Sequence, residues 1–160
     1  MSIAVGDSLP AGSLHENTPG TKHNPAELFA SGKHVIFAVP GAFTPGCSKT
    51  HLPGYVADHA AIAAKGIDSV NCVAVNDAFV MAAWGAAHNA DGKIRMLADP
   101  AGEWTTALGL DVNAAVLGGL RSKRYSMVVE NGTVTQLNVE PDGFGLSCSC
   151  LLYTSPSPRD

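Results

Sequence analysis

The chain has 160 residues, a mass of 16.4 kDa, 46% hydrophobic and 15% charged residues, and a formal net charge of −4. This length predicts one domain that can bury a core without metal or disulfide staples. The acidic balance offers no basic stripe for phosphate backbones or anionic lipids, so neither nucleic acid nor membrane partners are expected.

The opening residues, MSIAVGDSLP, have no cationic start followed by an apolar run, and no apolar stretch approaches the length of a membrane span. The chain is therefore expected in the cytoplasm. Its four cysteines are too sparse for a secreted disulfide framework, and a reducing compartment would keep them as thiols. A catalytic or redox use has to be considered for Cys47, Cys72, Cys148 and Cys150.

Two apolar runs predict buried strands near the start of the chain. Residues 34–39, HVIFAV, precede a Pro-Gly pair, and residues 67–75 form the second run. Residues 46–65 between them have helical composition, with Gly66 as the stop and Pro53 expected to kink the helix. The order strand, helix, strand follows.

The alternation of strands and helices continues downstream. Either Asn76 or Asp77 can cap a second helix that runs through Ala90. Residues 94–98 then predict a further short strand, closed by Pro100. The pattern is that of repeated βαβ units with parallel strands.

A hairpin is predicted to end the sheet. Residues 125–129 and 133–139 flank Asn131-Gly132, and this dipeptide favours a type I′ turn because both central residues need positive φ. Parallel βαβ units followed by a hairpin predict an α/β, thioredoxin-like fold with a central mixed sheet flanked by helices.

The domain is expected to occupy residues 1–149. Residues 150–160 end in LLYTSPSPRD, which has two prolines, two serines and no helical or strand period. This segment is expected to be a loose tail, either foreign to the natural protein or a natural disordered terminus.

Cys47 has the setting of an activated thiol. A free cysteine is only about 3% ionised at pH 7, so a nucleophilic cysteine needs a lowered pKa. Cys47 follows a strand and the loop PGAFTPG, and it enters the predicted helix, where unpaired N–H groups and the helix dipole favour an anion. This placement argues against the alternative of a buried, inert thiol.

Two other kinds of site, a phosphate-binding loop and a metal site, have weaker support in the sequence. Gly41, Gly46 and the Cys47-Ser48 pair match a phosphate-binding loop except that its lysine is replaced by cysteine, which removes the cation for the outer phosphates. A metal site is not expected, because Cys148 and Cys150 form an isolated pair and the six histidines show no HxxxH spacing. No cofactor is predicted.

The segment PGAFTPGCSKTHLPGYV, residues 40–56, resembles the active-site segment of peroxiredoxins of the peroxiredoxin 5, or type II, group. The resemblance implies thiol-dependent reduction of hydrogen peroxide and small alkyl hydroperoxides through a cysteine sulfenic acid. It also implies thioredoxin or glutaredoxin as reductant, and a monomer or a homodimer. It continues through residues 72–84, 93–100, 123–134 and 137–149.

Four residue roles are implied by this resemblance. Cys47 would be the peroxidatic cysteine, Thr44 the hydroxyl that orients the peroxide, and Pro40 the ring that shields the thiolate. Arg124 would supply the cation. The residue types suit these roles, since a threonine three residues before Cys47 can reach bound oxygens and an arginine keeps its charge at every pH.

Two cysteines compete to resolve the sulfenic acid. Cys72 resembles the position used in plant type II enzymes, and Cys148 resembles the position used in animal peroxiredoxin 5. Cys72 lies in the apolar run VNCVAV, which favours a packed core thiol, whereas Cys148 lies in the polar segment GLSCS near the end of the chain. Cys148 is the preferred prediction, with Cys72 as the alternative.

Two other function classes remain as alternatives. A thioredoxin-like thiol–disulfide oxidoreductase would be expected to carry a CxxC pair at the helix start, and only Ser48 to Thr50 follow Cys47. A non-catalytic redox interaction module would not need Thr44, Cys47 and Arg124 together.

Overall fold

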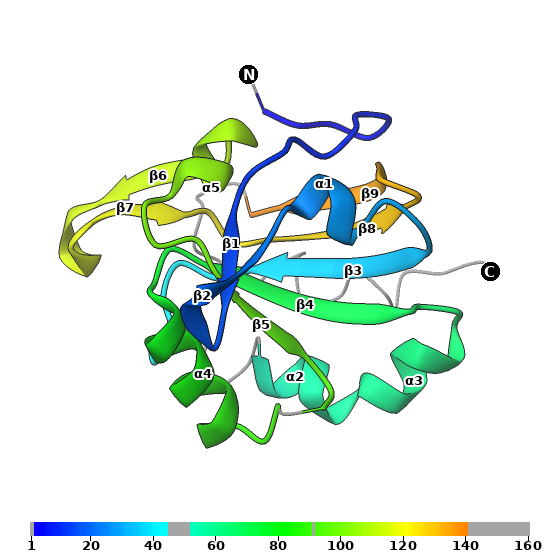
Figure 1. Cartoon of the computed structure of the whole chain (residues 1–160), viewed down its shortest axis with the longest axis horizontal. Helices are drawn as coiled ribbons and strands as arrows, with labels where there is room; N and C mark the ends of the chain where they lie inside the picture. Colours follow the sequence, from blue (N-terminus) through cyan, green and yellow to red (C-terminus); the bar gives the residue numbers. More distant parts are fainter. Residues whose placement is uncertain (1, 45–51, 91, 141–160) are drawn as a thin grey trace.

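The computed structural model describes residues 2–44, 52–90 and 92–140 (Figure 1). Its main sheet has seven strands in the order β2-β1-β5-β4-β3-β8-β9. Strands β3, β4 and β5 are parallel, and the outer strands join them antiparallel. The bounds are β1 Leu14–Glu16, β2 Thr18–His23, β3 Lys33–Ala38, β4 Ser69–Ala74, β5 Arg95–Ala98, β8 Tyr125–Glu130 and β9 Thr133–Val139.

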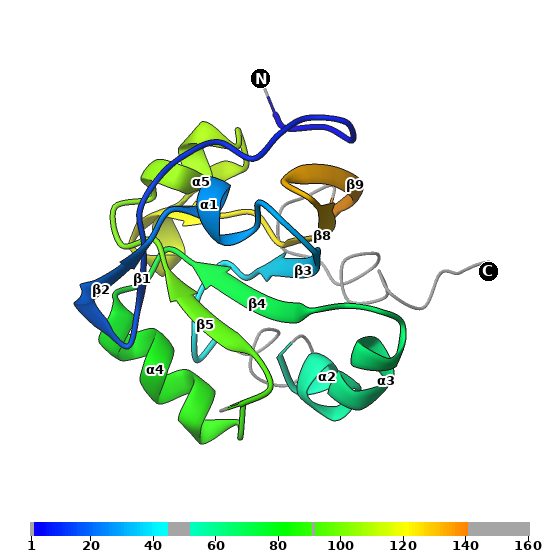
Figure 2. The ribbon, with the colours of Figure 1, turned by 45° about the vertical axis from the view of Figure 1, so that its right-hand side comes forward.

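Helices cover both faces of this sheet. Helices α2, α3 and α4 lie on one face, and α1 and α5 lie on the other (Figures 1 and 2). The predicted mixed sheet flanked by helices is therefore confirmed. The bounds are α1 Pro25–Leu28, α2 Leu52–Ala57, α3 His59–Ala64, α4 Ala78–Ala87 and α5 Glu103–Ala107.

Each face of the sheet has its own hydrophobic core. Side chains alternate along β3, so Val35 and Phe37 enter one core while Ile36 and Ala38 enter the other, and all four are fully buried. This double burial explains why the strand reads as a continuous apolar run. The Phe37 ring also stacks on Tyr55 of α2, with centroids 4.1 Å apart, and so fixes this helix against the sheet.

The closing hairpin has the predicted turn. Asn131 and Gly132 both adopt positive φ, 52° and 82°. The turn joins β8 to β9, and β9 forms the edge of the sheet.

The described part of the helix predicted over residues 46–65 forms two helices, α2 and α3. Helix formation is interrupted at Asp58, with φ −98° and ψ 9°, and Pro53 lies within α2. Aspartate disfavours helix interiors because its side chain competes for backbone groups. Gly66, with φ 87°, ends α3 as expected.

Helix α4 settles the choice between its two candidate caps. The Asp77 carboxylate accepts from the Val80 N–H at 2.8 Å, so Asp77 is the N-cap and Asn76 is not. The helix ends at Ala87, short of Ala90, because the chain turns through Asn89 in the left-handed region at φ 58°.

Several short elements were not predicted. They are the β1–β2 hairpin, α1, α5 and a small ribbon that projects from the body of the molecule (Figure 1). This ribbon comprises β6, Asp111–Ala114, and β7, Gly119–Ser122, joined through the 3-10 helix Ala115–Leu117. Among the described residues, none of the helices has the length and apolar character needed to cross a bilayer.

Candidate active site

The carboxyl ends of β3 and β4 and the start of β8 lie together, at one end of the sheet's strands. Strand β3 runs into residues 39–44, and its Val39 N–H donates to Val73 O of the parallel neighbour β4 at 3.2 Å. Strand β8 runs the other way, and its first residue, Tyr125, pairs with Ala38 at the end of β3. This register places Arg124 beside the start of the loop that follows β3. Ligand sites of open α/β sheets form at such carboxyl ends.

The loop after β3 folds back on itself. Thr44 Oγ1 donates to Gly41 O at 2.7 Å, and Phe43 between them adopts φ 62°. A bulky residue at positive φ is unusual, and such strain is typical of functional loops. Because its proton is engaged with Gly41, the Thr44 hydroxyl retains lone pairs that can accept a hydrogen bond from a ligand. Pro40 is buried at the start of the turn.

One side chain from elsewhere in the chain holds this loop, and a second lies beside it. Asn76, just after β4, accepts from the Ala42 N–H at 3.0 Å. Arg121 of β7 donates from Nη1 to Val75 O at 3.1 Å, and a Cβ on Gly41 would lie 3.3 Å from that nitrogen. The sequence did not point to either role, because both depend on contacts between distant segments. Asn76 appeared only as a possible helix cap.

Arg124 is a buried cation. Only 4% of the residue is exposed, and its backbone carbonyl accepts from the Glu140 N–H at 3.0 Å. A guanidinium screened from water exerts a stronger field on a nearby anion than an exposed one does. Pro40, Thr44 and Arg124 therefore lie at the same edge of the sheet. Cys47, Cys148 and Cys150 lie outside the described residues.

Cys72 is a packed core thiol. It is fully buried in β4, where it pairs with Phe37 on one side and Met96 on the other. Its side chain belongs to the core that also contains Leu52 and Tyr55 of α2, the helix downstream of Cys47. The burial expected for Cys72 is confirmed, and the residue nevertheless faces the side of the sheet that α2 covers.

Tyr125 adjoins Arg124 without offering acid–base chemistry. Its ring is fully buried, and its hydroxyl has no hydrogen-bond partner among the described residues. Burial, followed by the charges of Asp99 and Cys72, raises the pKa of the Tyr125 hydroxyl far above its ordinary value. The hydroxyl is therefore protonated near neutral pH and does not act as a general base there.

The Tyr125→Phe variant is expected to be as stable as the wild type, or more stable by about 1 kcal/mol. The substitution keeps the buried ring and removes a hydroxyl that is desolvated without compensation. Denaturant unfolding of both proteins measures the difference. A loss of more than about 1 kcal/mol would show that the hydroxyl has a favourable partner.

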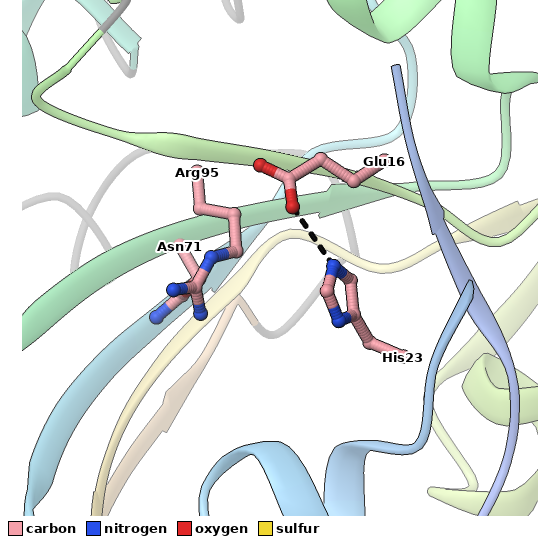
Figure 3. Close-up of polar contacts among 4 residues, drawn as sticks. All are labelled: Glu16, His23, Asn71 and Arg95. Atoms are coloured by element: carbon pink, nitrogen blue, oxygen red, sulfur yellow. Dashed lines mark hydrogen bonds and ion pairs between the residues drawn. The ribbon is translucent and has the colours of Figure 1, made fainter. Parts of the chain in front are cut away.

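The opposite end of the sheet carries a polar network (Figure 3). Arg95 donates to Asn71 Oδ1 at 3.2 Å, and Asn71 donates in turn to Ser69 Oγ at 2.9 Å. On the neighbouring hairpin, Glu16 pairs with His23 at 2.8 Å. A hollow of about 300 Å³ beside this network is lined by side chains of both charges, Glu16 and Asp68 with Lys93 and Arg95, and by His59. Among the described residues, no group of three His, Cys, Asp or Glu side chains is placed to hold a metal ion.

The comparisons with known proteins agree with one another. A family model described as Redoxin matches residues 4–145. Peroxiredoxin-2E, chloroplastic, of Arabidopsis thaliana is 42% identical over 149 residues; the match covers 89% of this chain and 64% of that longer protein. The crystal structure of reduced Prx3 from Vibrio vulnificus in complex with H2O2 is 52% identical, with a TM-score of 0.85, covering 91% of this chain and 93% of that one. Peroxiredoxin 5 from Alvinella pompejana is 39% identical, with a TM-score of 0.82 over 91% of this chain and 95% of that one. The chain belongs to the redoxin family and, within it, to the peroxiredoxins, which are thiol-dependent peroxidases.

Proposed function

We propose that Cys47 is the peroxidatic cysteine of this chain and that its substrates are hydrogen peroxide and small alkyl hydroperoxides. The observation that carries the proposal is that the Thr44 hydroxyl, in the loop after β3, and the buried Arg124, just before β8, both lie at the end of the strands from which the chain runs on to Cys47. The complex of the Vibrio vulnificus relative with H2O2 supports the choice of substrate.

The reaction is a displacement at oxygen. The Cys47 thiolate attacks one peroxide oxygen, the O–O bond breaks, and the products are a sulfenic acid and water or an alcohol, once the leaving oxygen takes a proton. Sulfur is oxidised and the peroxide is reduced. Thr44 accepts a hydrogen bond from the peroxide, and Arg124 stabilises the charge that develops on the separating oxygens. Pro40 limits the access of water to the thiolate.

Thiolate formation alone does not account for fast catalysis. Lowering the cysteine pKa from about 8.5 to about 6 raises the ionised fraction roughly 30-fold, which corresponds to about 2 kcal/mol. A less basic thiolate is also intrinsically less nucleophilic. Donors and charges that are in place before the reaction must therefore supply the remaining stabilisation.

Stopped-flow mixing of the reduced protein with hydrogen peroxide tests the proposed function. A rapid phase that consumes one equivalent of peroxide per chain is expected, before any reductant is added. Reaction no faster than that of a free thiol such as reduced glutathione would overturn the proposal.

The Arg124→Met variant is expected to react with peroxide at least about tenfold more slowly than the wild type, even at a pH where its cysteine is fully ionised. Methionine preserves most of the buried volume and removes the cation that acts in the transition state. The rate of peroxide reaction, followed against pH alongside thiolate absorbance, separates the two effects. Lys123→Met is the matched control, because it removes the same charge one residue away. Full recovery of the Arg124→Met rate at high pH would show that Arg124 only tunes ionisation.

We propose that Cys148 resolves the sulfenic acid and that thioredoxin or glutaredoxin then reduces the disulfide. The burial of Cys72 within a central strand supports Cys148 over Cys72.

We further propose the cytoplasm as the location, from the composition of the chain and its redox chemistry. Fractionation of the source cells tests that location.

A further inference from the structure

The turn at Gly41 and Ala42 connects two side chains through a single peptide group. The Ala42 N–H donates to Asn76 Oδ1 at 3.0 Å, and the Gly41 carbonyl accepts from Thr44 Oγ1 at 2.7 Å. This N–H and this carbonyl belong to the same peptide bond. A peptide bond is planar, and in the trans form its N–H and C=O point in opposite directions. Asn76 and Thr44 therefore lie at the two ends of one rigid unit.

We infer that Asn76 is a positioning residue for peroxide reduction and that it acts through this peptide group on Thr44. The inference rests on the proposed function, because it concerns the orientation of the hydroxyl that receives the peroxide. By accepting from Ala42, Asn76 fixes the plane of the peptide. The Gly41 carbonyl then accepts the Thr44 hydrogen bond in one direction and leaves the hydroxyl lone pairs facing the ligand.

The surroundings of Asn76 and Gly41 support this role. Asn76 is not needed as the cap of α4, since Asp77 performs that function. At Gly41, an added Cβ would lie 3.2 Å from Thr44 Cγ2 and 3.3 Å from Arg121 Nη1, so the Thr44 and Arg121 side chains would have to shift by a few tenths of an ångström. Arg121 is itself held by Val75 O and by Leu117 O, at 3.1 and 2.6 Å. The peptide group thus sits in a fixed frame.

Loss of the Asn76 acceptor releases the peptide without changing the thiol chemically. Peroxide reduction requires a correctly oriented Thr44 hydroxyl, whereas alkylation by iodoacetamide requires only an accessible thiolate. The ratio of these two rate constants therefore reports on positioning and cancels changes in ionisation. A residue with a merely structural role would change both rates together.

A double-mutant cycle between Asn76→Ala and Thr44→Val tests the inference. Each single variant is expected to lower the ratio of peroxide to iodoacetamide rate constants by about tenfold, and the double variant is expected to be no slower than Thr44→Val alone. Asn76→Asp keeps an oxygen acceptor in the same frame and is expected to recover most of the ratio. Asp77→Ala is the matched control: it removes the cap of α4 and lowers the melting temperature, but leaves the ratio unchanged.

The outcomes separate the inference from the proposed function. Independent, additive effects of Asn76→Ala and Thr44→Val, or an unchanged ratio in Asn76→Ala, would overturn the inference while the wild type still reduced peroxide. A wild type that failed to react with peroxide would overturn the proposed function and the inference with it. If Asn76→Ala folds poorly, Asn76→Ser replaces it, and hydrogen exchange of the Ala42 amide is measured in that variant. An Asn76→Ser protein with a lowered rate ratio but an Ala42 amide as protected as in the wild type would contradict the role.

Discussion

Cys47→Ser is expected to abolish peroxide consumption, while single replacements of Cys72, Cys148 and Cys150 by serine each leave one rapid turnover intact. A serine hydroxyl is not ionised near neutral pH and does not accept oxygen to form a stable acid, so no other group in the loop can replace the sulfur. Peroxide consumption by stopped-flow mixing measures the effect. The three other serine variants are matched controls, since each removes one thiol from the same chain.

One result with the Cys47→Ser variant would contradict the assignment of Cys47 as the nucleophile. If Cys47→Ser consumed peroxide at the wild-type rate, the nucleophile would be another cysteine and the roles of Thr44 and Arg124 would lose their basis. Circular dichroism of the variant excludes a trivial loss of fold.

Cys148→Ser is expected to stop thioredoxin-driven turnover after the first cycle, and Cys150→Ser is expected to leave it running. A disulfide needs Cα atoms within about 7 Å. Cys72 is fully buried in a central strand paired with both neighbours, so its sulfur can reach another only if the strand or the covering helix α2 moves. The sequence GLSCS around Cys148 has no apolar run like that of β4, and on this basis we expect its sulfur to reach Cys47 at a smaller free-energy cost.

Peptide mapping of the oxidised, non-reduced protein identifies the resolving thiol. The expected linkage joins the peptides that contain Cys47 and Cys148. Mainly Cys47–Cys72 linkage would favour the alternative, which is compatible with Cys72 facing the side of the sheet that α2 covers. An unlinked sulfenic acid that persisted would indicate a cycle with an external thiol.

Strong local signals allowed the framework of the fold to be predicted. The apolar run of β3 is buried on both faces, and the Asn131-Gly132 dipeptide forms the predicted turn. The β6–β7 ribbon was missed because its strands, DVNA and GLRS, carry few β-branched or aromatic residues. The turn before β7 depends instead on Gly118 and Gly119 at φ 99° and 126°.

The candidate site likewise contains some residues that the sequence predicted and others that it did not. Pro40 and Thr44 followed from segment 40–56 and Arg124 from segment 123–134, through their resemblance to a family, and the structure places all three at one end of the sheet's strands. The contributions of Asn76 and Arg121 could not be predicted, because Asn76 reaches a backbone N–H 34 residues away and Arg121 reaches a carbonyl 46 residues away. Such contacts exist only after β3, β4 and the ribbon have come together.

The most direct measurement is a count of the oxidation state of all four cysteines after the reduced wild-type protein has met less than one equivalent of hydrogen peroxide in the presence of a sulfenic acid trap. Mass spectrometry of the digested, alkylated protein gives the fraction of each cysteine that was oxidised. We expect the oxidising equivalents to be recovered at Cys47, either as the trapped sulfenic acid or as a disulfide in which Cys47 is one partner. Recovery of Cys47 as a free thiol while Cys72, Cys148 or Cys150 carried the oxidation would contradict its assignment as the peroxidatic residue.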